Sequence, residues 1–287
     1  MMYRLLFIVL LTVLTSCSKS NSDTLFTLLE PSKTGIDFKN EVKNGENMNI
    51  FKYRNFYNGG GVAIGDINND GLADVFFISN QGANKLYLNK GDFKFEDISV
   101  QSGIQGKKAW STGVVMVDIN ADGFLDIYVL DAGSNIDAIR KSQLYINNKN
   151  NTFTEKAAEY NLADTGITTH AAFFDYDKDG DLDLFVGNNS LNNRFGSTSD
   201  CYLLKNNKGV FALAEAKTFE GIGMVTEAVF SDFNKDGKVD LIVVGEWMKP
   251  TFFANKNGKF VNVTDTVFPE KSNGLYQTII PFDIDND

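Results

Sequence analysis

The sequence predicts an all-β protein, a β-propeller built from four-stranded blades, and three features lead to that fold class. A nine-residue pattern, D-x-[DN]-x-D-G-x-x-D, occurs four times along the 287 residues. Each copy is flanked by two short apolar runs of the kind that form buried strands. Two more strand-like runs follow before the next copy begins. Four strands in a unit of this length are the content of one propeller blade.

The copies of the pattern recur at a regular interval. Their first residues are 52, 57 and 57 residues apart, and a truncated fifth copy begins 51 residues later. Self-similarity at such a period is the signature of a repeat fold. The copies are DINNDGLAD (66–74), DINADGFLD (118–126), DYDKDGDLD (175–183), DFNKDGKVD (232–240) and DIDND (283–287).

The runs around each copy give the strands of a blade. GVAIGD, GVVMVD, AAFFD and AVFSD lead into the loops, and VFFIS, IYVLD, LFVGN and LIVVG leave them, so each loop is predicted to be the turn of a β-hairpin. Runs such as KLYLN and FKFEDIS supply the third and fourth strands. We expect blade cores near 59–100, 111–158, 169–217 and 226–266, with the start of the next blade at 277–287.

Four blades alone would form an open fan with exposed strand edges, which favour aggregation. We therefore expect this chain to be the N-terminal part of a longer propeller. The predicted organisation is a lipoprotein signal peptide at 1–16, a lipidated cysteine and flexible tether at 17–30, and a partial propeller at 31–287.

The spacing of oxygen-bearing side chains in the loops predicts calcium binding. Calcium takes six to eight oxygen ligands at about 2.3–2.6 Å, and side chains at positions 1, 3 and 5 can converge on one ion only if the backbone curls around it. Glycine at position 6 permits the sharp turn. Position 7 then offers its backbone carbonyl and position 9 returns a carboxylate.

The same positions supply the predicted ligands in every loop, about one Ca²⁺ for each complete loop and four in all. They are Asp66, Asn68, Asp70, Leu72 and Asp74; Asp118, Asn120, Asp122, Phe124 and Asp126; Asp175, Asp177, Asp179, Asp181 and Asp183; Asp232, Asn234, Asp236, Lys238 and Asp240; and, in the truncated copy, Asp283, Asp285 and Asp287.

Two other interpretations of these loops are less well supported. Magnesium demands tighter octahedral geometry and keeps its waters. An EF-hand needs a glutamate at position 12 and flanking helices, whereas position 12 here is Phe77, Val129, Val186 or Val243. The sequence therefore excludes the EF-hand.

The charge balance argues against nucleic acid as a partner. The chain has 37 acidic and 27 basic residues and a formal net charge of −10. Phosphate binding needs clustered lysine and arginine, and no such cluster is apparent. The loop aspartates account for much of the negative charge, and each bound calcium ion would offset two units of it.

The N-terminus has the features of a targeting segment. Arg4 precedes a short apolar run, LLFIVLLTVL (5–14), which is too short to span a bilayer as a helix. The run ends in LTSC, which resembles the lipobox of bacterial lipoproteins and implies acylation of Cys17. An ordinary signal peptide that happens to carry a cysteine is the alternative. We expect a membrane-anchored bacterial lipoprotein of the outer membrane or cell surface.

Lipidation of Cys17 would leave Cys201 without a disulfide partner, because the chain has two cysteines. We expect Cys201 to be a buried, inert thiol.

Several segments resemble the FG-GAP/VCBS repeats of integrin-type β-propellers. They are FYNGGGVAIGDINNDGLADVFF, WSTGVVMVDINADGFLDIYV and GEWMKPTFFANKNGKF, and their details are similar to bacterial lipoproteins of the cartilage acidic protein (ASPIC/UnbV-associated) group. The resemblance covers residue 30 to the end. It implies the propeller fold and calcium, and it implies closure by N-terminal strands, for which 34–42 and 49–57 are candidates.

In integrin-like propellers the calcium loops lie on the lower face, and the starts of the first strands lie near the axis on the opposite face. The residues at those starts differ between repeats here, as expected where packing does not dictate the side chain. A funnel there would suit a sugar or polar peptide. The alternative is that the residues at these positions are ordinary rim residues that bind no ligand. The candidate ligand-face residues are Trp110, Thr112, His170, Glu227 and Tyr276.

The expected function is that of a calcium-binding, surface-tethered binding or adhesion module for an extracellular or periplasmic glycan or protein ligand, with the membrane contacted only through the lipid anchor. The alternative is a polysaccharide lyase or hydrolase on a calcium-stabilised propeller, and a third possibility is a scaffold for a downstream domain. His170 is the single histidine, which limits catalysis, although pairing with Glu227 as acid and base is conceivable. No GxSxG motif is present.

Overall fold

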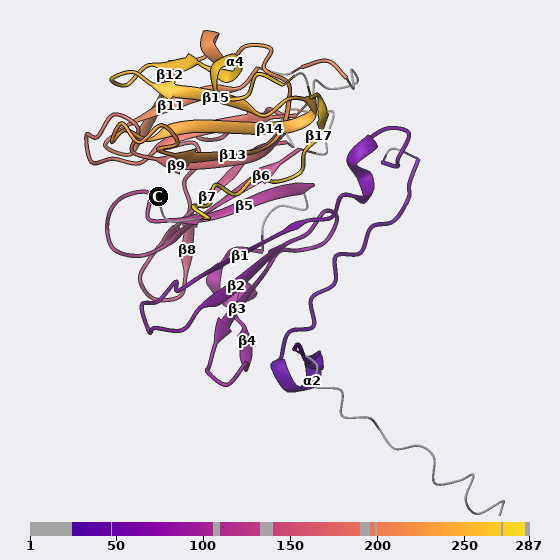
Figure 1. The fold of residues 1–287 in the computed structure, drawn as a ribbon. Helices are drawn as coiled ribbons and strands as arrows, with labels where there is room; N and C mark the ends of the chain where they lie inside the picture. The colour runs from indigo at the N-terminus through magenta and orange to yellow at the C-terminus, as the bar shows by residue number, and fades with distance from the viewer. Residues whose placement is uncertain are drawn as a thin grey trace, which may run out of the picture.

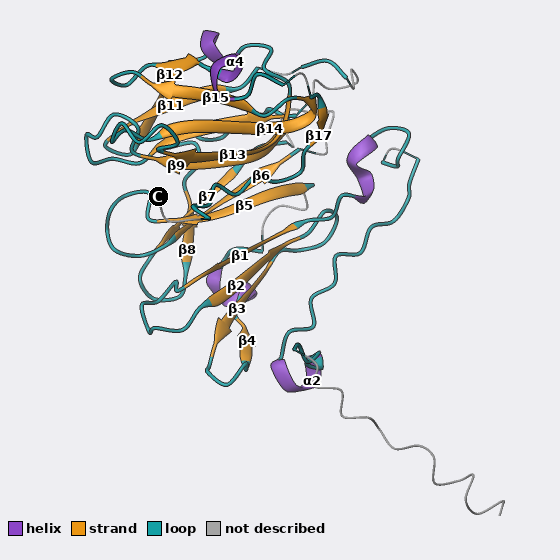
Figure 2. Cartoon of the chain, in the orientation of Figure 1, coloured by secondary structure: helices purple, strands orange, loops and turns teal. Residues whose placement is uncertain are grey.

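The fold of the chain is taken from a computed structural model, which describes residues 25–46, 48–105, 110–132, 140–189, 196–198, 200–270 and 272–284. The predicted signal peptide, Cys17, Asp285 and Asp287 lie outside these ranges. Almost all the regular structure is β (Figure 2). Four antiparallel sheets follow one another in chain order, from the first at one end of the molecule to the fourth at the other (Figure 1). The predicted all-β architecture of four-stranded blades is confirmed.

In each sheet the strands are ordered as they occur in the chain, each paired with the next. The first sheet contains β1 (Gly61–Gly65), β2 (Asp74–Ile78), β3 (Lys85–Asn89) and β4 (Phe95–Asp97). The second contains β5 (Ser111–Val117), β6 (Asp126–Asp131), β7 (Gln143–Asn147) and β8 (Phe153–Glu155).

The third sheet contains β9 (Thr168–Phe174), β10 (Asp183–Asn188), β11 (Tyr202–Asn207) and β12 (Val210–Glu215). The fourth contains β13 (Met224–Ser231), β14 (Asp240–Met248), β15 (Thr251–Asn255) and β16 (Phe260–Asn262), and β17 (Gly274–Leu275) also pairs with β14.

Helices are short in the described ranges, and none there is long and apolar enough to cross a membrane. They are α2 (Pro31–Thr34), α3 (Ser99–Ser102), α4 (Thr264–Val267) and the 3₁₀ turns η1 (Arg54–Tyr57) and η2 (Lys217–Phe219).

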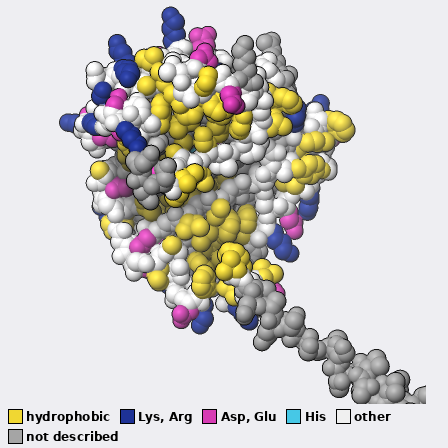
Figure 3. All heavy atoms as spheres, in the orientation of Figure 1, with side chains coloured by type: hydrophobic (Ala, Val, Ile, Leu, Met, Phe, Trp, Pro, Cys, Tyr) yellow, Lys and Arg dark blue, Asp and Glu magenta, His cyan; other side chains and the backbone are white. Residues whose placement is uncertain are grey.

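The hydrophobic core is divided into three layers, one between each pair of neighbouring sheets. Phe76 and Leu86 of the first sheet pack in one cluster with Ile127 and Tyr145 of the second. Corresponding clusters join the second sheet to the third and the third to the fourth. The second and third sheets therefore bury both faces against neighbouring sheets, and the first and fourth bury one face each in this way, as expected of a repeat protein. On the first sheet, where Figure 3 shows hydrophobic side chains gathered, Val62 and Ile64 are exposed.

The first strands of consecutive sheets lie beside one another and line the axis. In the second, third and fourth sheets a threonine near the start of the first strand links that sheet to the part of the chain that follows. Thr169 Oγ1 lies 3.3 Å from the carbonyl oxygen of Gly187 in its own sheet and 2.7 Å from that of Val225 in the next. Thr112 occupies the same position and bridges the second and third sheets in the same way. Thr226 bridges the fourth sheet to the carbonyl of Tyr276, which follows β17. These hydroxyls hold the sheets in register at the axis.

An asparagine at or near the end of the third strand makes a second link between sheets in the second and fourth sheets. Asn255 Nδ2 donates to the carbonyl of Val239 in its own hairpin at 3.2 Å and to that of Tyr176 in the preceding sheet at 2.9 Å. Asn147 bonds Ile67 of the preceding sheet in the same way, at 2.8 Å. Asn89 makes only the bond within its own sheet, to Ala73.

We expect Asn255→Ala to destabilise the protein by about 2–3 kcal/mol, because it removes several buried hydrogen bonds, each worth about 1 kcal/mol. Asn89→Ala, which removes no bond between sheets, should cost about 1 kcal/mol less. Urea unfolding of the two variants measures the difference. Equal losses would show that the bond between sheets contributes nothing.

The segment before the first sheet differs from the expectation of closing strands at 34–42 and 49–57. Neither range forms a ladder; 54–57 is a 3₁₀ turn. Residues of 34–42 instead lie against the first sheet, where Phe38 stacks on Phe77 at 4.9 Å and Asp37 accepts a hydrogen bond from Tyr87 at 2.9 Å. Residues 34–42 are therefore held on the first sheet by side-chain contacts and not by strand pairing.

The expected start of a fifth blade lies along β13, but the described residues from 276 to 284 form no strand. The Tyr276 carbonyl accepts from Thr226, and the Ile279 N–H donates to Glu227 at 2.8 Å. These contacts are those that a following first strand would make.

Cys201 is buried, as predicted. Its side chain is fully covered, and burial raises the pKa of its thiol to about 12. We expect it to resist a thiol reagent in the native protein at pH 8, and to react fully in denaturant, because only the thiolate is nucleophilic. Titration of the C17S chain with Ellman's reagent measures this. Rapid labelling of the native chain would show that this region opens readily.

Candidate functional site

The four nine-residue loops join the first strand of each sheet to the second, as predicted. Their sharp turn depends on two residues with left-handed backbone. The glycine at position 6 has φ between 80° and 97° in all four loops. A Cβ on any of these glycines would meet no atom within 4 Å, so glycine is favoured by backbone conformation and not by space. Position 4 is left-handed as well, in Asn69, Ala121, Lys178 and Lys235.

The aspartate at position 1 is held by the loop backbone. In the second loop Asp118 Oδ1 accepts the N–H of Asp122 at 2.9 Å, and Oδ2 accepts the N–H of Gly123 at 2.8 Å. The same pair of bonds occurs in the other three loops. The aspartate at position 5 accepts the N–H of position 7 in every loop. The loop thus curls around its own carboxylates.

The aspartate at position 9 is the buried member of each set, at no more than 1 % exposure. One oxygen accepts the N–H of the third-strand asparagine, at 2.7–2.8 Å in all four sheets. In the first three loops the other oxygen accepts the N–H of position 2. Position 9 therefore joins the loop, the second strand and the third strand.

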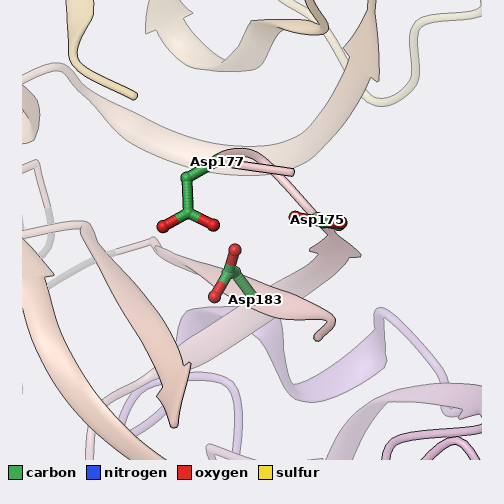
Figure 4. A group of neighbouring side chains, drawn as sticks. All are labelled: Asp175, Asp177 and Asp183. Carbon is green, nitrogen blue, oxygen red and sulfur yellow. The ribbon is translucent and has the colours of Figure 1, made fainter. Parts of the chain in front are cut away.

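The third loop brings three carboxylates together. Asp175, Asp177 and Asp183 each place an oxygen within 4.8 Å of the others, and they form the one such group of metal-ligating residue types in the described ranges. Figure 4 shows the carboxylates of Asp177 and Asp183 facing each other, with Asp175 to the side. This triad could hold a metal ion. In the other loops position 3 is an asparagine, so they offer three carboxylates and one amide.

The fourth loop contains an unsatisfied buried acceptor. Asp240 is fully buried, and within the described part of the chain its Oδ2 has no hydrogen-bonding partner. Asp177 Oδ1 in the third loop is in the same state. Leaving a buried carboxylate oxygen unpaired costs free energy, so both atoms fit a site completed by a cation.

Lysine side chains lie against the outer carboxylates of three loops. Lys205 bonds Asp177 and lies 2.8 Å from Asp179. Lys149 lies 3.4 Å from Asp122, and Lys256 lies 3.8 Å from Asp236. In the absence of a bound cation, these ammonium groups partly neutralise the negative charge of the loop carboxylates.

The buried aspartates at position 9 have abnormal pKa values. Burial raises the pKa of Asp126 to about 6 and that of Asp183 to about 7, and neighbouring carboxylates add to the effect. Burial also raises the pKa of Asp74 and of Asp240. The ordinary value is about 4.

We expect the calcium-free chain to lose stability as the pH rises from 5.5 to 8. In that interval the folded state holds protons that the unfolded chain has already released, so deprotonation favours unfolding. Urea midpoints measured in a chelator at the two pH values test this. A calcium-free chain that becomes more stable at pH 8 would contradict it.

A pocket of about 170 Å³ lies at the other end of the sheets from the loops. Its walls come from the segment around η1 that precedes the first sheet, from the starts of the first strands and from the ends of the second strands. Trp110 and Thr112, both predicted for the ligand face, line it. Trp110 is almost fully buried and packs on Phe56 and Tyr53 at centroid distances of 5.0 and 5.5 Å. The remaining lining residues are Tyr53, Asn55, Asn58, Gly59, Gly60, Thr169, Asn189, Thr226, Glu246 and Gln277.

The other three predicted ligand-face residues are not part of the pocket lining. His170 Nε2 lies 2.9 Å from the Ala228 carbonyl of the next sheet, and burial lowers the pKa of its ring. Glu227 accepts the N–H of Ile279, and the Tyr276 hydroxyl lies near Ser272. His170 and Glu227 are neighbours, but both side chains have structural hydrogen bonds.

Two important pocket residues, Asn189 and Glu246, were missed by the sequence reasoning. Asn189 follows the second strand β10 and Glu246 lies near the end of the second strand β14, whereas the prediction used only the starts of the first strands. Counted along the sequence, Asn80, Ala132, Asn189 and Glu246 each lie six residues after the position-9 aspartate of their loop and so fall at one equivalent position. Their variation between sheets was a signal available in the sequence.

Comparison with known proteins identifies the repeat. A family model described as FG-GAP-like repeat matches residues 47–129, 133–186 and 232–287, more than half of the chain. Cartilage acidic protein 1 of Xenopus tropicalis is 30% identical over 200 residues, which cover 66% of this chain and 29% of that protein. The human protein of that name is 26% identical over 227 residues, covering 77% of this chain and 33% of its own length. The chain thus spans about a third of the length of these relatives.

Two solved structures are similar in part. A lectin of Agrocybe aegerita, described as recognising non-reducing terminal N-acetylglucosamine, aligns with a TM-score of 0.45 at 18% identity, covering 71% of this chain and 51% of the lectin. The V. cholerae biofilm matrix protein Bap1 aligns with a TM-score of 0.31 at 14% identity, covering 70% of this chain and 30% of Bap1.

Proposed function

The chain belongs to the family of FG-GAP-like repeat proteins, and on that premise we propose that it is a calcium-stabilised module that binds a glycan or protein ligand at a cell surface. One observation carries this proposal. The loops at one end of the sheets repeat the same residues and hydrogen bonds. At the other end the threonines at the starts of the first strands recur, whereas the pocket residues contributed by the second-strand side, Asn189 and Glu246, differ from sheet to sheet. Repetition indicates a shared structural role, and variation is what a specific ligand site requires.

Each complete loop is proposed to hold one Ca²⁺, four in all. All-oxygen donor sets are the ligands that calcium prefers, and the loops combine carboxylate, amide and backbone oxygens. The orphaned oxygens of Asp240 and Asp177 support the assignment. Bound calcium would supply the positive charge that keeps each buried position-9 aspartate ionised. Isothermal titration calorimetry, with magnesium as the competing ion, counts and identifies the sites.

Anchoring is proposed to occur through a lipid on Cys17, at the outer membrane or cell surface. The lipobox-like LTSC at 14–17 supports this. Metabolic labelling with an alkyne fatty acid should mark the wild-type chain and leave C17S unmarked. Equal labelling of the wild-type and C17S chains would contradict lipid attachment at Cys17.

Ligand binding is tested by affinity electrophoresis. The C17S chain is run through native gels that contain neutral, acidic or amino-sugar polysaccharides, with calcium or with a chelator. Retardation that needs calcium, without loss of polysaccharide chain length, supports a binding module. Shortening of the polysaccharide would favour the alternative, a lyase or hydrolase. If no gel retards the chain, the tested glycans are excluded as ligands and a protein ligand remains the proposal.

A further inference from the structure

The axial pocket is rich in hydrogen-bond acceptors. Thr112, Thr169 and Thr226 line it, and each hydroxyl has a single proton that is shared between two backbone carbonyls. What these hydroxyls still offer is lone pairs. Glu246 adds a carboxylate, and no lysine or arginine is among the lining residues.

Asn189 provides a buried acceptor that points to a missing donor. Its side chain is 1 % exposed, it lines the pocket, and within the described residues its Oδ1 has no hydrogen-bonding partner. Its Nδ2 lies 3.4 Å from the Val225 carbonyl of the next sheet. An unsatisfied amide oxygen in such a position is costly unless something occupies the pocket.

The first sheet contains a satisfied version of the same arrangement. Asn80, like Asn189, lies six residues after the position-9 aspartate of its loop, and its Nδ2 donates to the Ser111 carbonyl of the next sheet at 3.0 Å. Its Oδ1, however, accepts an N–H from Asn40 at 2.6 Å. Where the N-terminal segment supplies a donor the acceptor is paired, and at Asn189 no segment of the described chain supplies one.

Glu246 occupies the equivalent position in the fourth sheet and is presented by an irregular backbone. The register between β14 and β17 shifts between Glu246 and Met248. Trp247, between them, has φ of 59°, an uncommon conformation for a residue other than glycine. Strain of this kind persists where surrounding structure imposes it, often at ligand sites. The described residues place no cation within ion-pair distance of Glu246.

We propose that this pocket binds a primary ammonium group, held by Glu246, by the unpaired oxygen of Asn189 and by the lone pairs of the threonines. Three N–H donors on one positive centre match a carboxylate and several neutral acceptors. The rings of Tyr53 and Trp110 add aromatic surface that favours a cation. At about 170 Å³ the pocket is smaller than the roughly 300 Å³ and upward of typical ligand sites, so it suits the end of a side chain or a single sugar ring.

Two sources could present this group, a lysine side chain of a protein or an amino sugar of a polysaccharide. The inference rests on the proposed binding function and makes its ligand site specific. Calcium is kept constant and saturating in every titration, so that the state of the loops does not change. The number of bound calcium ions is measured separately. A chain that binds calcium but no ammonium probe would therefore contradict the pocket ligand alone, and a chain that binds no calcium would contradict the proposed role of the loops.

The experiment uses tryptophan fluorescence. The chain has two tryptophans, so Trp247→Phe in the C17S chain leaves Trp110, in the pocket wall, as the sole reporter. The probes are acetyl-lysine methylamide and glucosamine, and their neutral counterparts are acetyl-norleucine methylamide and N-acetylglucosamine. We expect a saturable change with at least one cation and none with its counterpart, and the responding cation identifies the source.

Two further measurements test the charge. Glu246→Gln keeps the shape and should weaken binding about tenfold or more, since a hydrogen bond between charged groups is worth about 1.5–3 kcal/mol. Glu220→Gln, an exposed change outside the pocket, should have no effect. Raising the salt concentration should weaken binding to the W247F chain, independently of the folding of any further variant. Equal binding of a cation and its neutral counterpart, or binding of neither cation, overturns the proposal.

Discussion

Calcium is expected to raise the melting temperature of the C17S chain by of the order of 20 °C, with magnesium far less effective. A ligand that binds only the folded state stabilises it by about 2.7 kcal/mol for each site at 100 times its Kd, and four such sites give about 10 kcal/mol. For a domain of this size 1 kcal/mol corresponds to about 2–4 °C. A melt followed by circular dichroism, with calcium, with magnesium and with a chelator, makes the measurement.

The physical basis of this expectation is the set of buried aspartates. Asp74, Asp126, Asp183 and Asp240 are buried at the root of each hairpin, close to the other loop carboxylates. Without a cation, ionising them places like charges together away from water, which is unfavourable. A melting temperature that does not respond to calcium would mean that lysines and protons suffice to neutralise the loops, and that calcium is not a structural ligand.

The hairpins and buried strands of this fold could be predicted from the sequence because the same pattern occurs in every repeat. Four copies of one loop fix the hairpins, and the apolar runs beside them fix which strands are buried. The residues that link one sheet to the next were not predicted. Asn147 and Asn255 sit at the end of a third strand like any turn-forming asparagine, and only the stacking of sheets brings their amide groups to Ile67 and Tyr176.

The residues that line the pocket were predicted only in part, for a related reason. Trp110 and Thr112 line the pocket, whereas the His170 ring hydrogen-bonds the Ala228 carbonyl of the next sheet and so links two sheets. Asn189 and Glu246 reach the pocket from the second strands, and their importance depends on which acceptors lack a partner. That property arises from the folded arrangement and has no local sequence pattern.

Replacing Asp183 by alanine should be among the most damaging single substitutions in the third sheet. Asp183 accepts the N–H groups of Asn206 at 2.8 Å and of Tyr176 at 3.3 Å. Alanine leaves both donors buried without a partner, at about 1–3 kcal/mol each, so we expect a loss of about 3 kcal/mol or more even in a chelator. The loss should be larger in calcium, because the same change removes a ligand of one site.

Asp181→Ala is the matched control, two residues away in the same loop. Position 7 is predicted to bind calcium through its backbone carbonyl. Among the described residues, the Asp181 carboxylate accepts one exposed N–H, from Lys208 at 3.2 Å. We expect D181A to change stability by no more than about 0.5 kcal/mol and to leave the calcium count unaltered. Calorimetry should then find one ion fewer on D183A than on D181A. If both variants lose the same ion, the position 7 side chain is itself a ligand; if neither does, the third loop is closed by Lys205 and its aspartates alone.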